Sequence, residues 1–203
     1  MKKLISELIT QGHLKSPAVI KAFERIKRRD FMPADLAAEE SINAPLPIGH
    51  GQTISQPLTV AFMLELLDLF EGQKVLDIGS GSGWTTALLA AIVGPTGRVF
   101  AIERIRSLKE FGESNVRKYS FNNIEFFCQD GSKGLKESEP FDRILVSASA
   151  FEIPEELKRQ LKIGGRLVIP TTANDIRLIH RVDKNNYREE IYPGFVFVPL
   201  VEG

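Results

Sequence analysis

Acidic residues lie at the ends of three successive β-rich runs of this chain, at positions where carboxylates could bind the amino and hydroxyl groups of a ligand. Asp77 lies in the segment 75–83 (VLDIGSGSG), just before glycines whose bare backbone lets a ligand approach. Glu103 ends the next run, at roughly the 20-residue spacing expected for an acid that holds ribose hydroxyls. Asp130 and Gly131 follow the third run. Any one acid could equally cap a turn, but together they predict one extended ligand.

The glycine spacing narrows the class of ligand. A dinucleotide-binding turn typically reads Gly-x-Gly-x-x-Gly, and Trp84 occupies the place of the third glycine. Asp77 would oppose a pyrophosphate, whereas it suits a cationic amino group. These two residues therefore disfavour a nicotinamide dehydrogenase.

The segment 45–57 (PLPIGHGQTISQP) is rich in residues that interrupt helices and strands, and its hydrophobic residues show no amphipathic period. Its three prolines and two glycines disfavour a continuous helix or a central strand, because proline fixes φ and lacks a donor while glycine admits positive φ. A loop so restricted is a candidate for presenting side chains. We therefore expect a shaped site here.

The elements that would position these residues change in character along the chain. Amphipathic helices are predicted at 3–11 and 17–29, and a largely apolar helix at 57–70. Beyond them, β-rich runs alternate with helical ones, which is typical of a parallel sheet with crossover helices. The predicted strands are 74–78, 98–102, 124–128, 143–147 and 166–169, the predicted helices are 83–93, 105–118 and 154–161, and a final hairpin pairs 176–183 with 190–198. The predicted fold is α/β and Rossmann-like, with a mostly parallel central sheet, helices on both faces and an antiparallel C-terminal hairpin.

The length of 203 residues predicts one domain, 1–203. Within it, 1–56 would form an N-terminal helical extension and the shaped loop, and 57–203 the ligand-binding core and the hairpin. The second N-terminal helix ends in a basic cluster, which we interpret as a solvated helix end that complements the helix dipole. The cluster consists of Arg25, Lys27, Arg28 and Arg29.

Composition disfavours several classes of partner. Lys plus Arg and Asp plus Glu both total 26, so the net charge of zero provides no long-range attraction to nucleic acid or anionic lipid. Cys128 is the only cysteine, so we expect neither an internal disulfide nor a usual zinc site, which fits a reducing cytoplasm. Glu7 and Gln11 interrupt the N-terminal apolar run, so neither a signal peptide nor a membrane span is predicted.

Five segments resemble the protein-L-isoaspartate O-methyltransferases, a family of the class I S-adenosylmethionine-dependent methyltransferases. They are 45–57, 75–83, 141–144 (FDRI), 164–170 (GGRLVIP) and 197–200 (FVPL). The resemblance covers nearly the whole chain. It implies methyl transfer from S-adenosyl-L-methionine, leaving S-adenosyl-L-homocysteine, to the free carboxylate of L-isoaspartyl residues in damaged proteins and peptides. The ester would then close to a succinimide, which makes the reaction one of protein repair.

The resemblance also implies which residues hold the cofactor. In class I methyltransferases the first acidic and glycine segment holds the methionine part, the next acid the ribose, and the third the adenine. The residues at these positions are Asp77, Gly79, Ser80, Gly81, Gly83, Glu103, Asp130 and Gly131.

On the acceptor side, the resemblance implies that Ser55 is the active-site serine and hydrogen-bonds the substrate carboxylate. Ser55 could instead, or also, cap a helix that begins near Pro57. Thr53 and Ile54 would wall the substrate site, and Gln52 could meet the substrate backbone. A carboxylate with a pKa of about 4 is ionised at neutral pH, so the reaction needs no general base or metal, and no histidine receives a role.

Ser41, Asn43 and Phe151 depart from the residues usual in the family near the expected substrate mouth, namely an aromatic residue, an acid and a proline. Trp84 could pack near the methionine part or form a core contact where a helix begins. The departures leave open a divergent carboxyl methyltransferase for another peptide or a small acid. A non-catalytic S-adenosylmethionine-binding protein is a further alternative. We expect a monomer that acts on isoaspartyl proteins and peptides.

Overall fold

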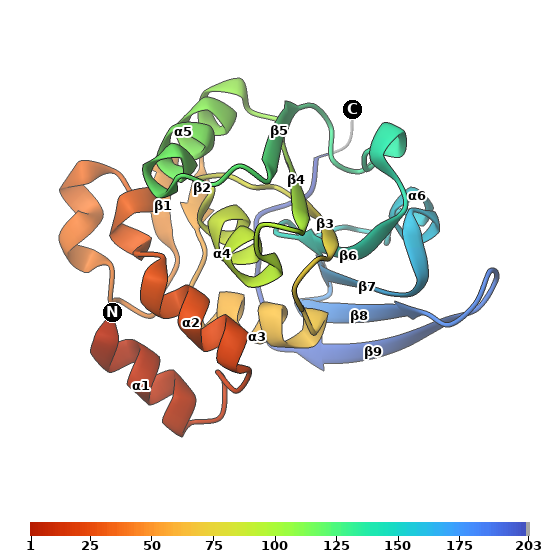
Figure 1. The fold of residues 1–203 in the computed structure, drawn as a ribbon, viewed down its shortest axis with the longest axis horizontal. Coiled ribbons are helices and arrows are strands. Elements are labelled where there is room, and N and C mark those ends of the chain that lie inside the picture. The colour runs from red at the N-terminus through yellow and green to blue at the C-terminus, as the bar shows by residue number, and fades with distance from the viewer. Residues whose placement is uncertain (202–203) are drawn as a thin grey trace.

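A seven-stranded sheet forms the centre of the protein (Figure 1). The computed structural model describes residues 1–201. The strands lie in the order β5-β4-β3-β6-β7-β8-β9; the first five are parallel, and each of the last two is antiparallel to the strand before it. The predicted sheet and its C-terminal hairpin are confirmed. The bounds are β3 Lys74–Ile78, β4 Arg98–Glu103, β5 Ile124–Cys128, β6 Phe141–Val146, β7 Leu161–Thr171, β8 Asp175–Arg181 and β9 Tyr187–Pro193.

The larger helices form two layers over one face of this sheet. α3, α4 and α5 contact the strands, while α2 packs on α3 and α4, and α1 packs on α2 (Figure 1). No helix within residues 1–201 is both long and apolar enough to cross a membrane. The bounds are α1 Lys2–Thr10, α2 Pro17–Arg25, α3 Pro57–Leu67, α4 Trp84–Val93, α5 Arg106–Val116 and α6 Glu155–Arg159.

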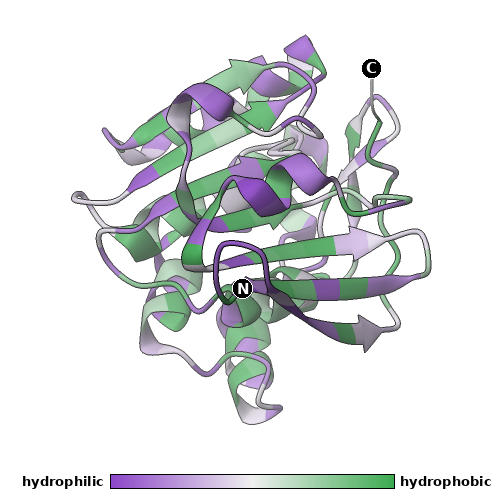
Figure 2. Cartoon of the chain, turned by 90° about the vertical axis from the view of Figure 1, so that its right-hand side faces the viewer, coloured by the Kyte–Doolittle hydropathy of each residue, from purple (hydrophilic) through white to green (hydrophobic). Residues whose placement is uncertain are grey.

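Both faces of the sheet are covered, which explains why its strands are nearly continuous runs of apolar residues. Successive side chains of a strand point to opposite faces. Val75 therefore joins the hydrophobic cluster beneath the larger helices, whereas Leu76 joins a second cluster that includes Leu157 of α6. Leu145 and Ile144 of β6 divide in the same way. Figure 2 shows the contrast between the mostly hydrophobic central strands and the largely hydrophilic α6, of which Leu157 is the buried residue.

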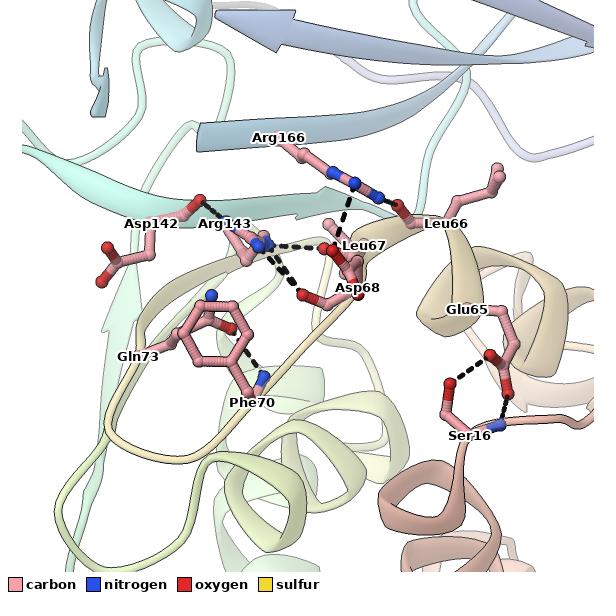
Figure 3. A network of polar contacts seen from close by, with 10 residues as sticks. All are labelled: Ser16, Glu65, Leu66, Leu67, Asp68, Phe70, Gln73, Asp142, Arg143 and Arg166. Carbon is pink, nitrogen blue, oxygen red and sulfur yellow. Dashed lines mark hydrogen bonds and ion pairs between the residues drawn. The ribbon is translucent and has the colours of Figure 1, made fainter. Parts of the chain in front are cut away.

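Two arginines from the sheet fix the C-terminal end of α3 (Figure 3). Arg166 of β7 donates a hydrogen bond to the Leu66 carbonyl at 3.0 Å. Arg143 of β6 donates to the Asp68 carbonyl at 2.9 Å. Cationic donors stabilise this end of a helix, because its last carbonyls lack partners within the helix. The contacts hold the C-terminal end of α3 against the sheet.

The chain after α2 differs from the prediction. The predicted helix 17–29 ends at Arg25, and a short 3-10 helix, η1 (Arg28–Phe31), follows it. Phe31 is buried in the core, and the turn that buries it carries Arg28 inside as well, with 0% of its side chain exposed. The interpretation of Arg28 as part of a solvated helix end is therefore wrong, although Arg25 is exposed as expected.

The C-terminal segment also differs from the prediction. The second strand of the hairpin was expected at 190–198, but β9 ends at Pro193. The following residues leave the sheet edge and return to the end of β6, where the Ser149 amide donates to the Val198 carbonyl at 2.8 Å. This return brings residues 198–201 to the carboxyl ends of the parallel strands.

Candidate functional site

A cavity of about 900 Å³, its open mouth included, lies at the carboxyl ends of β3, β4 and β6. β4 and β6 flank β3 on opposite sides, so the cavity occupies the topological switch point, where open α/β sheets bind ligands. Two other segments help to line it: the antiparallel hairpin of β1 (Leu46–Gly49) and β2 (Gln52–Ile54), and residues 198–201. We call it the inner cavity. The proline- and glycine-rich loop 45–57 thus contains a small hairpin outside the central sheet.

The glycine-rich turn after β3 forms one wall of the inner cavity. Gly79, Ser80 and Gly81 line it, and the φ angles of +77° at Gly79 and +49° at Gly81 favour glycine. Gly83 does not line it. A Cβ at Gly83 would lie 2.7 Å from the carbonyl oxygen of Gly112, so this glycine serves the packing of α4 on α5.

Three polar side-chain atoms in and beside this turn are buried and have no hydrogen-bond partner within residues 1–201. They are Asp77 Oδ1, Ser80 Oγ and Trp84 Nε1. Because buried polar groups are normally paired, these atoms indicate a polar ligand. An acceptor, a hydroxyl and a donor suit the ammonium and carboxylate of an amino acid. The residues present therefore fit the methionine part of the cofactor that the resemblance implies.

Asp77 is fully buried and is not one of the residues that line the inner cavity. Its Oδ2 accepts a hydrogen bond from the Thr86 hydroxyl at 2.6 Å. Burial, with a smaller contribution from the charge of Glu103, raises the pKa of Asp77 to about 7 against the opposing effect of the Thr86 hydrogen bond. A cationic donor at Oδ1 would favour the ionised form. Contact between Asp77 and the amino group of the ligand stays a prediction.

Glu103 lines the inner cavity, and only 6% of it is exposed. One carboxylate oxygen accepts the Gly81 amide at 3.0 Å, and the other accepts the Ile105 amide at 2.9 Å. Each oxygen keeps a further lone pair, so Glu103 can still accept hydrogen bonds from ribose hydroxyls. The carboxylate thus joins the glycine-rich turn to the end of β4.

The two residues of the third acidic position, Asp130 and Gly131, differ in whether they line the inner cavity. Gly131 lines the inner cavity, and a Cβ there would lie 2.3 Å from Ile78 Cγ2, so only glycine fits this close approach. The Asp130 carboxylate does not line it, and accepts hydrogen bonds from the Ser132 amide at 2.8 Å and the Ser132 hydroxyl at 2.9 Å. Asp130 therefore shapes the turn, and its contact with adenine stays a prediction.

A second cavity adjoins the first and is lined by no residue of the glycine-rich turn, and we call it the outer cavity. Ser55 and Ser147 line both cavities, as do Thr53 and Val198. Ser55 does not cap α3: the N-cap residue is Gln56, and the Ser55 hydroxyl makes no hydrogen bond within residues 1–201. The cap interpretation is therefore wrong, and the hydroxyl is available where the two cavities meet.

The three residues before Ser55 were all predicted to lie at the substrate site, but they differ in which cavity they line. Thr53 borders both cavities, but Gln52 and Ile54 line only the inner one. Gln52 also donates from its amide to the His50 carbonyl at 3.4 Å, within the hairpin turn. Thr53 is therefore the best placed of the three to meet an acceptor, and the predicted substrate contacts of Gln52 and Ile54 remain predictions.

The positions that depart from the family have different surroundings. The Asn43 side chain accepts the Leu58 amide at 3.1 Å, which supplies the missing cap of α3. An acid at this position could accept the same hydrogen bond, so the departure keeps the cap. Ser41 and Phe151 line neither cavity, and Phe151 is 84% exposed.

Sequence reasoning missed several contributors to the site, among them Ser147, which lines both cavities. Arg28 donates from its guanidinium to the Ser55 carbonyl at 3.1 Å, and nothing in its basic cluster indicated burial. Residues 198–201 line the inner cavity, although the predicted strand 190–198 would have placed residue 198 in the hairpin. The segment 197–200 was one of the five that carried the resemblance, and that was a signal for it.

Comparison with known sequences gives matches over the whole length. A family model described as protein-L-isoaspartate(D-aspartate) O-methyltransferase (PCMT) matches residues 1–203. A protein-L-isoaspartate O-methyltransferase of Methanothermobacter thermautotrophicus is 41% identical over 204 residues, which cover 98% of this chain and 94% of the relative. A protein of the same description from Methanothrix thermoacetophila is 44% identical over 186 residues, covering 92% of this chain and 89% of the relative.

Solved structures agree with these matches. A Plasmodium falciparum protein described as a protein-L-isoaspartate O-methyltransferase, crystallised in complex with S-adenosyl-L-homocysteine, superposes with a TM-score of 0.90 at 26% identity. The match covers 100% of this chain and 98% of that one. A second structure of the same description has a TM-score of 0.89 at 29% identity, and the match covers 100% of this chain and 66% of that one.

Proposed function

Because the chain belongs to the protein-L-isoaspartate(D-aspartate) O-methyltransferase family, we propose that it methylates isoaspartyl carboxylates at Ser55, where the inner and outer cavities meet. The enzyme transfers a methyl group from S-adenosylmethionine to the free carboxylate of L-isoaspartyl residues in damaged proteins and peptides, and the ester then closes to a succinimide. The observation that carries the assignment to Ser55 is its free hydroxyl on the border of both cavities.

Cofactor binding is assigned to the inner cavity. Gly79, Ser80 and Gly81 would enclose the methionine part, Glu103 would accept the ribose hydroxyls, and Gly131 would admit the adenine. When bound, S-adenosylmethionine supplies an electrophilic methyl group on a sulfonium. The fit rests on the unpartnered buried atoms beside the turn and on the shape that the glycines leave open.

The outer cavity would admit the acceptor. The Ser55 hydroxyl donates a hydrogen bond to one oxygen of the isoaspartyl carboxylate and leaves the other oxygen free to attack. No base is required, since the carboxylate is already ionised at neutral pH. The apolar residues Ile54, Val60 and Leu200 line the inner cavity together with Ser55 and would exclude water from the approach. Alignment and water exclusion therefore account for the rate enhancement.

We also propose that the enzyme works as a single-domain monomer in the cytoplasm, without a nucleic acid partner. Residues of one chain line both cavities, so no second copy is needed to complete them. The balanced charge provides no field for a polyanion. Light scattering during gel filtration measures the molar mass, and a dimer would contradict the monomer.

A methyl-transfer assay on matched isoaspartyl and aspartyl peptides tests the function. Labelled methyl should appear on the isoaspartyl peptide alone, in a base-labile form, as expected of a methyl ester. Equal labelling of both peptides, or labelling of neither, would contradict the isoaspartyl assignment and favour a different carboxylate as the acceptor.

A further inference from the structure

The buried guanidinium of Arg28 joins two segments of the chain that lie apart in sequence. Its Nη1 donates to the Ile42 carbonyl at 2.8 Å, and its Nη2 donates to the Ala44 carbonyl at 2.8 Å. Nη2 also donates to the carbonyls of Ser55 at 3.1 Å and Ile54 at 3.4 Å. One planar fork therefore links the backbone before the β1–β2 hairpin to the backbone after it.

Both linked segments reach the proposed site. Pro45, next to Ala44, lines the outer cavity, and Ser55 lines both cavities. The guanidinium also lies over the ring of Trp84, with 5.5 Å between Cζ and the ring centroid. Trp84 lines the inner cavity. Arg28 thus contacts the backbone of the acceptor side and a side chain of the cofactor side.

Burial of the charged Arg28 guanidinium is energetically unfavourable. Its burial lowers the pKa of the guanidinium to about 10, with the charge of Glu40 opposing the shift, so the group stays charged at neutral pH. Its Nε is buried and has no partner in the described chain, residues 1–201. A buried charge seldom adds net stability, but it can favour one arrangement of the groups around it. Geometry rather than stability is the better reason for a charge here.

We propose that Arg28 is a positioning residue for methyl transfer, which holds the Ser55 backbone, and with it the Ser55 hydroxyl, in place relative to residues 42–45. This inference rests on the proposed function, because Arg28 acts through Ser55. A positioning residue determines how well the acceptor is aligned, so its loss should lower kcat much more than cofactor affinity.

The test uses Arg28→Lys, which keeps the charge and loses the planar fork. We expect kcat on an isoaspartyl peptide to fall at least about tenfold, because small misplacements of reacting groups are costly. The Kd of S-adenosylhomocysteine, measured by calorimetry, should change by less than about threefold. An unchanged kcat would overturn the inference. A wild-type enzyme that methylates no isoaspartyl peptide would reject the proposed function instead.

Arg143→Lys is the matched control. Arg143 is also buried and also donates to backbone carbonyls, those of Leu67 and Asp68, but it lies at the far end of α3 and lines neither cavity. Both variants should lower Tm, whereas only Arg28→Lys should lower kcat when each is assayed well below its Tm. An equal loss of kcat in both variants would mean that Arg28 acts only through stability.

A double variant tests whether Arg28 acts through Ser55. In a Ser55→Ala background, Arg28→Lys should lower kcat much less than it does in the wild-type background, because the positioned hydroxyl is already absent. Losses that multiply independently would contradict the inference. Arg28→Gln serves as the second variant if Arg28→Lys does not fold. Failure of both to fold, even with S-adenosylhomocysteine bound, would make Arg28 a residue of stability and reject the positioning role.

Discussion

The side chain of Asn43 accepts the backbone N–H of Leu58 at 3.1 Å, across 15 residues of sequence, and so caps α3 from outside the helix. Serine just before a helix often caps it, but here Asn43 supplies the cap in its place. Since the cap comes from Asn43, the Ser55 hydroxyl stays free at the border between the two cavities. The capping role of Asn43 and the proposed substrate contact of Ser55 can each be tested by substitution.

Ser55→Ala should lower kcat on an isoaspartyl peptide by about tenfold to a hundredfold, because a hydrogen bond to a charged group contributes about 1.5–3 kcal/mol. The Kd of S-adenosylhomocysteine should stay the same, and Tm should change little, since the hydroxyl caps nothing. Steady-state kinetics and calorimetry measure the two effects. Ser55→Thr, which keeps a hydroxyl, should retain more activity than Ser55→Ala. Equal turnover of Ser55→Ala and the wild type would rule out the assigned role.

Asn43→Ala should lower the free energy of unfolding by about 1 kcal/mol, because it removes the cap of α3. Urea denaturation followed by circular dichroism measures the change. Asn43→Asp is the control: its carboxylate can accept the same N–H, and its charge suits the N-terminal end of the helix dipole. The Asp variant should therefore be about as stable as the wild type. If Asn43→Ala were equally stable, the contact with Leu58 would be of no energetic consequence.

Gly83→Ala should be more destabilising than Gly164→Ala. The two glycines have nearly the same φ, +83° and +80°, so both variants carry similar backbone strain. Only at Gly83 would the new Cβ meet another group, the Gly112 carbonyl oxygen at 2.7 Å, while nothing lies within 4 Å at Gly164. Thermal unfolding of the two variants isolates the clash. Equal Tm values would show that α4 and α5 can separate without cost.

The contribution of Asp77 to the stability of the cofactor-free protein should fall as pH rises from about 4 to about 7. Its pKa is raised from 3.8 to about 7 by burial, so in this window the folded state binds a proton that the unfolded state has released. The contribution of Asp77 that favours folding is fully present below the unfolded-state pKa of 3.8, and it is lost as pH rises through the folded-state pKa of about 7. Thermal unfolding at pH 5 and pH 7.5 measures it.

Asp77→Asn provides the comparison for that measurement, because the amide stays neutral and its oxygen can still accept from Thr86. The Tm of the variant relative to wild type should be higher at pH 7.5 than at pH 5. The same difference at both pH values would mean that Asp77 is ionised throughout, despite its burial.

Much of the fold was predictable because its signals are local. The strands around Val75 and Leu145 are short apolar runs between turns, and their covering on both faces follows from that pattern. Glu103 and Gly131 were placed at one ligand because parallel strands bring their carboxyl ends to one edge of a sheet. The boundary at Pro193 was missed, since the residues beyond it are apolar enough to continue a strand.

The sequence by itself therefore determined the layered sheet, the glycine-rich turn and the proline- and glycine-rich loop that carries Ser55, all of which depend on residues close together in the chain. Only the tertiary structure decided that Arg28 is buried against the Ser55 carbonyl and that Asn43 caps α3. The physical reason is that a charged or polar side chain is stable inside only where partners from distant segments replace water. Those partners are brought together by the packing of the whole chain.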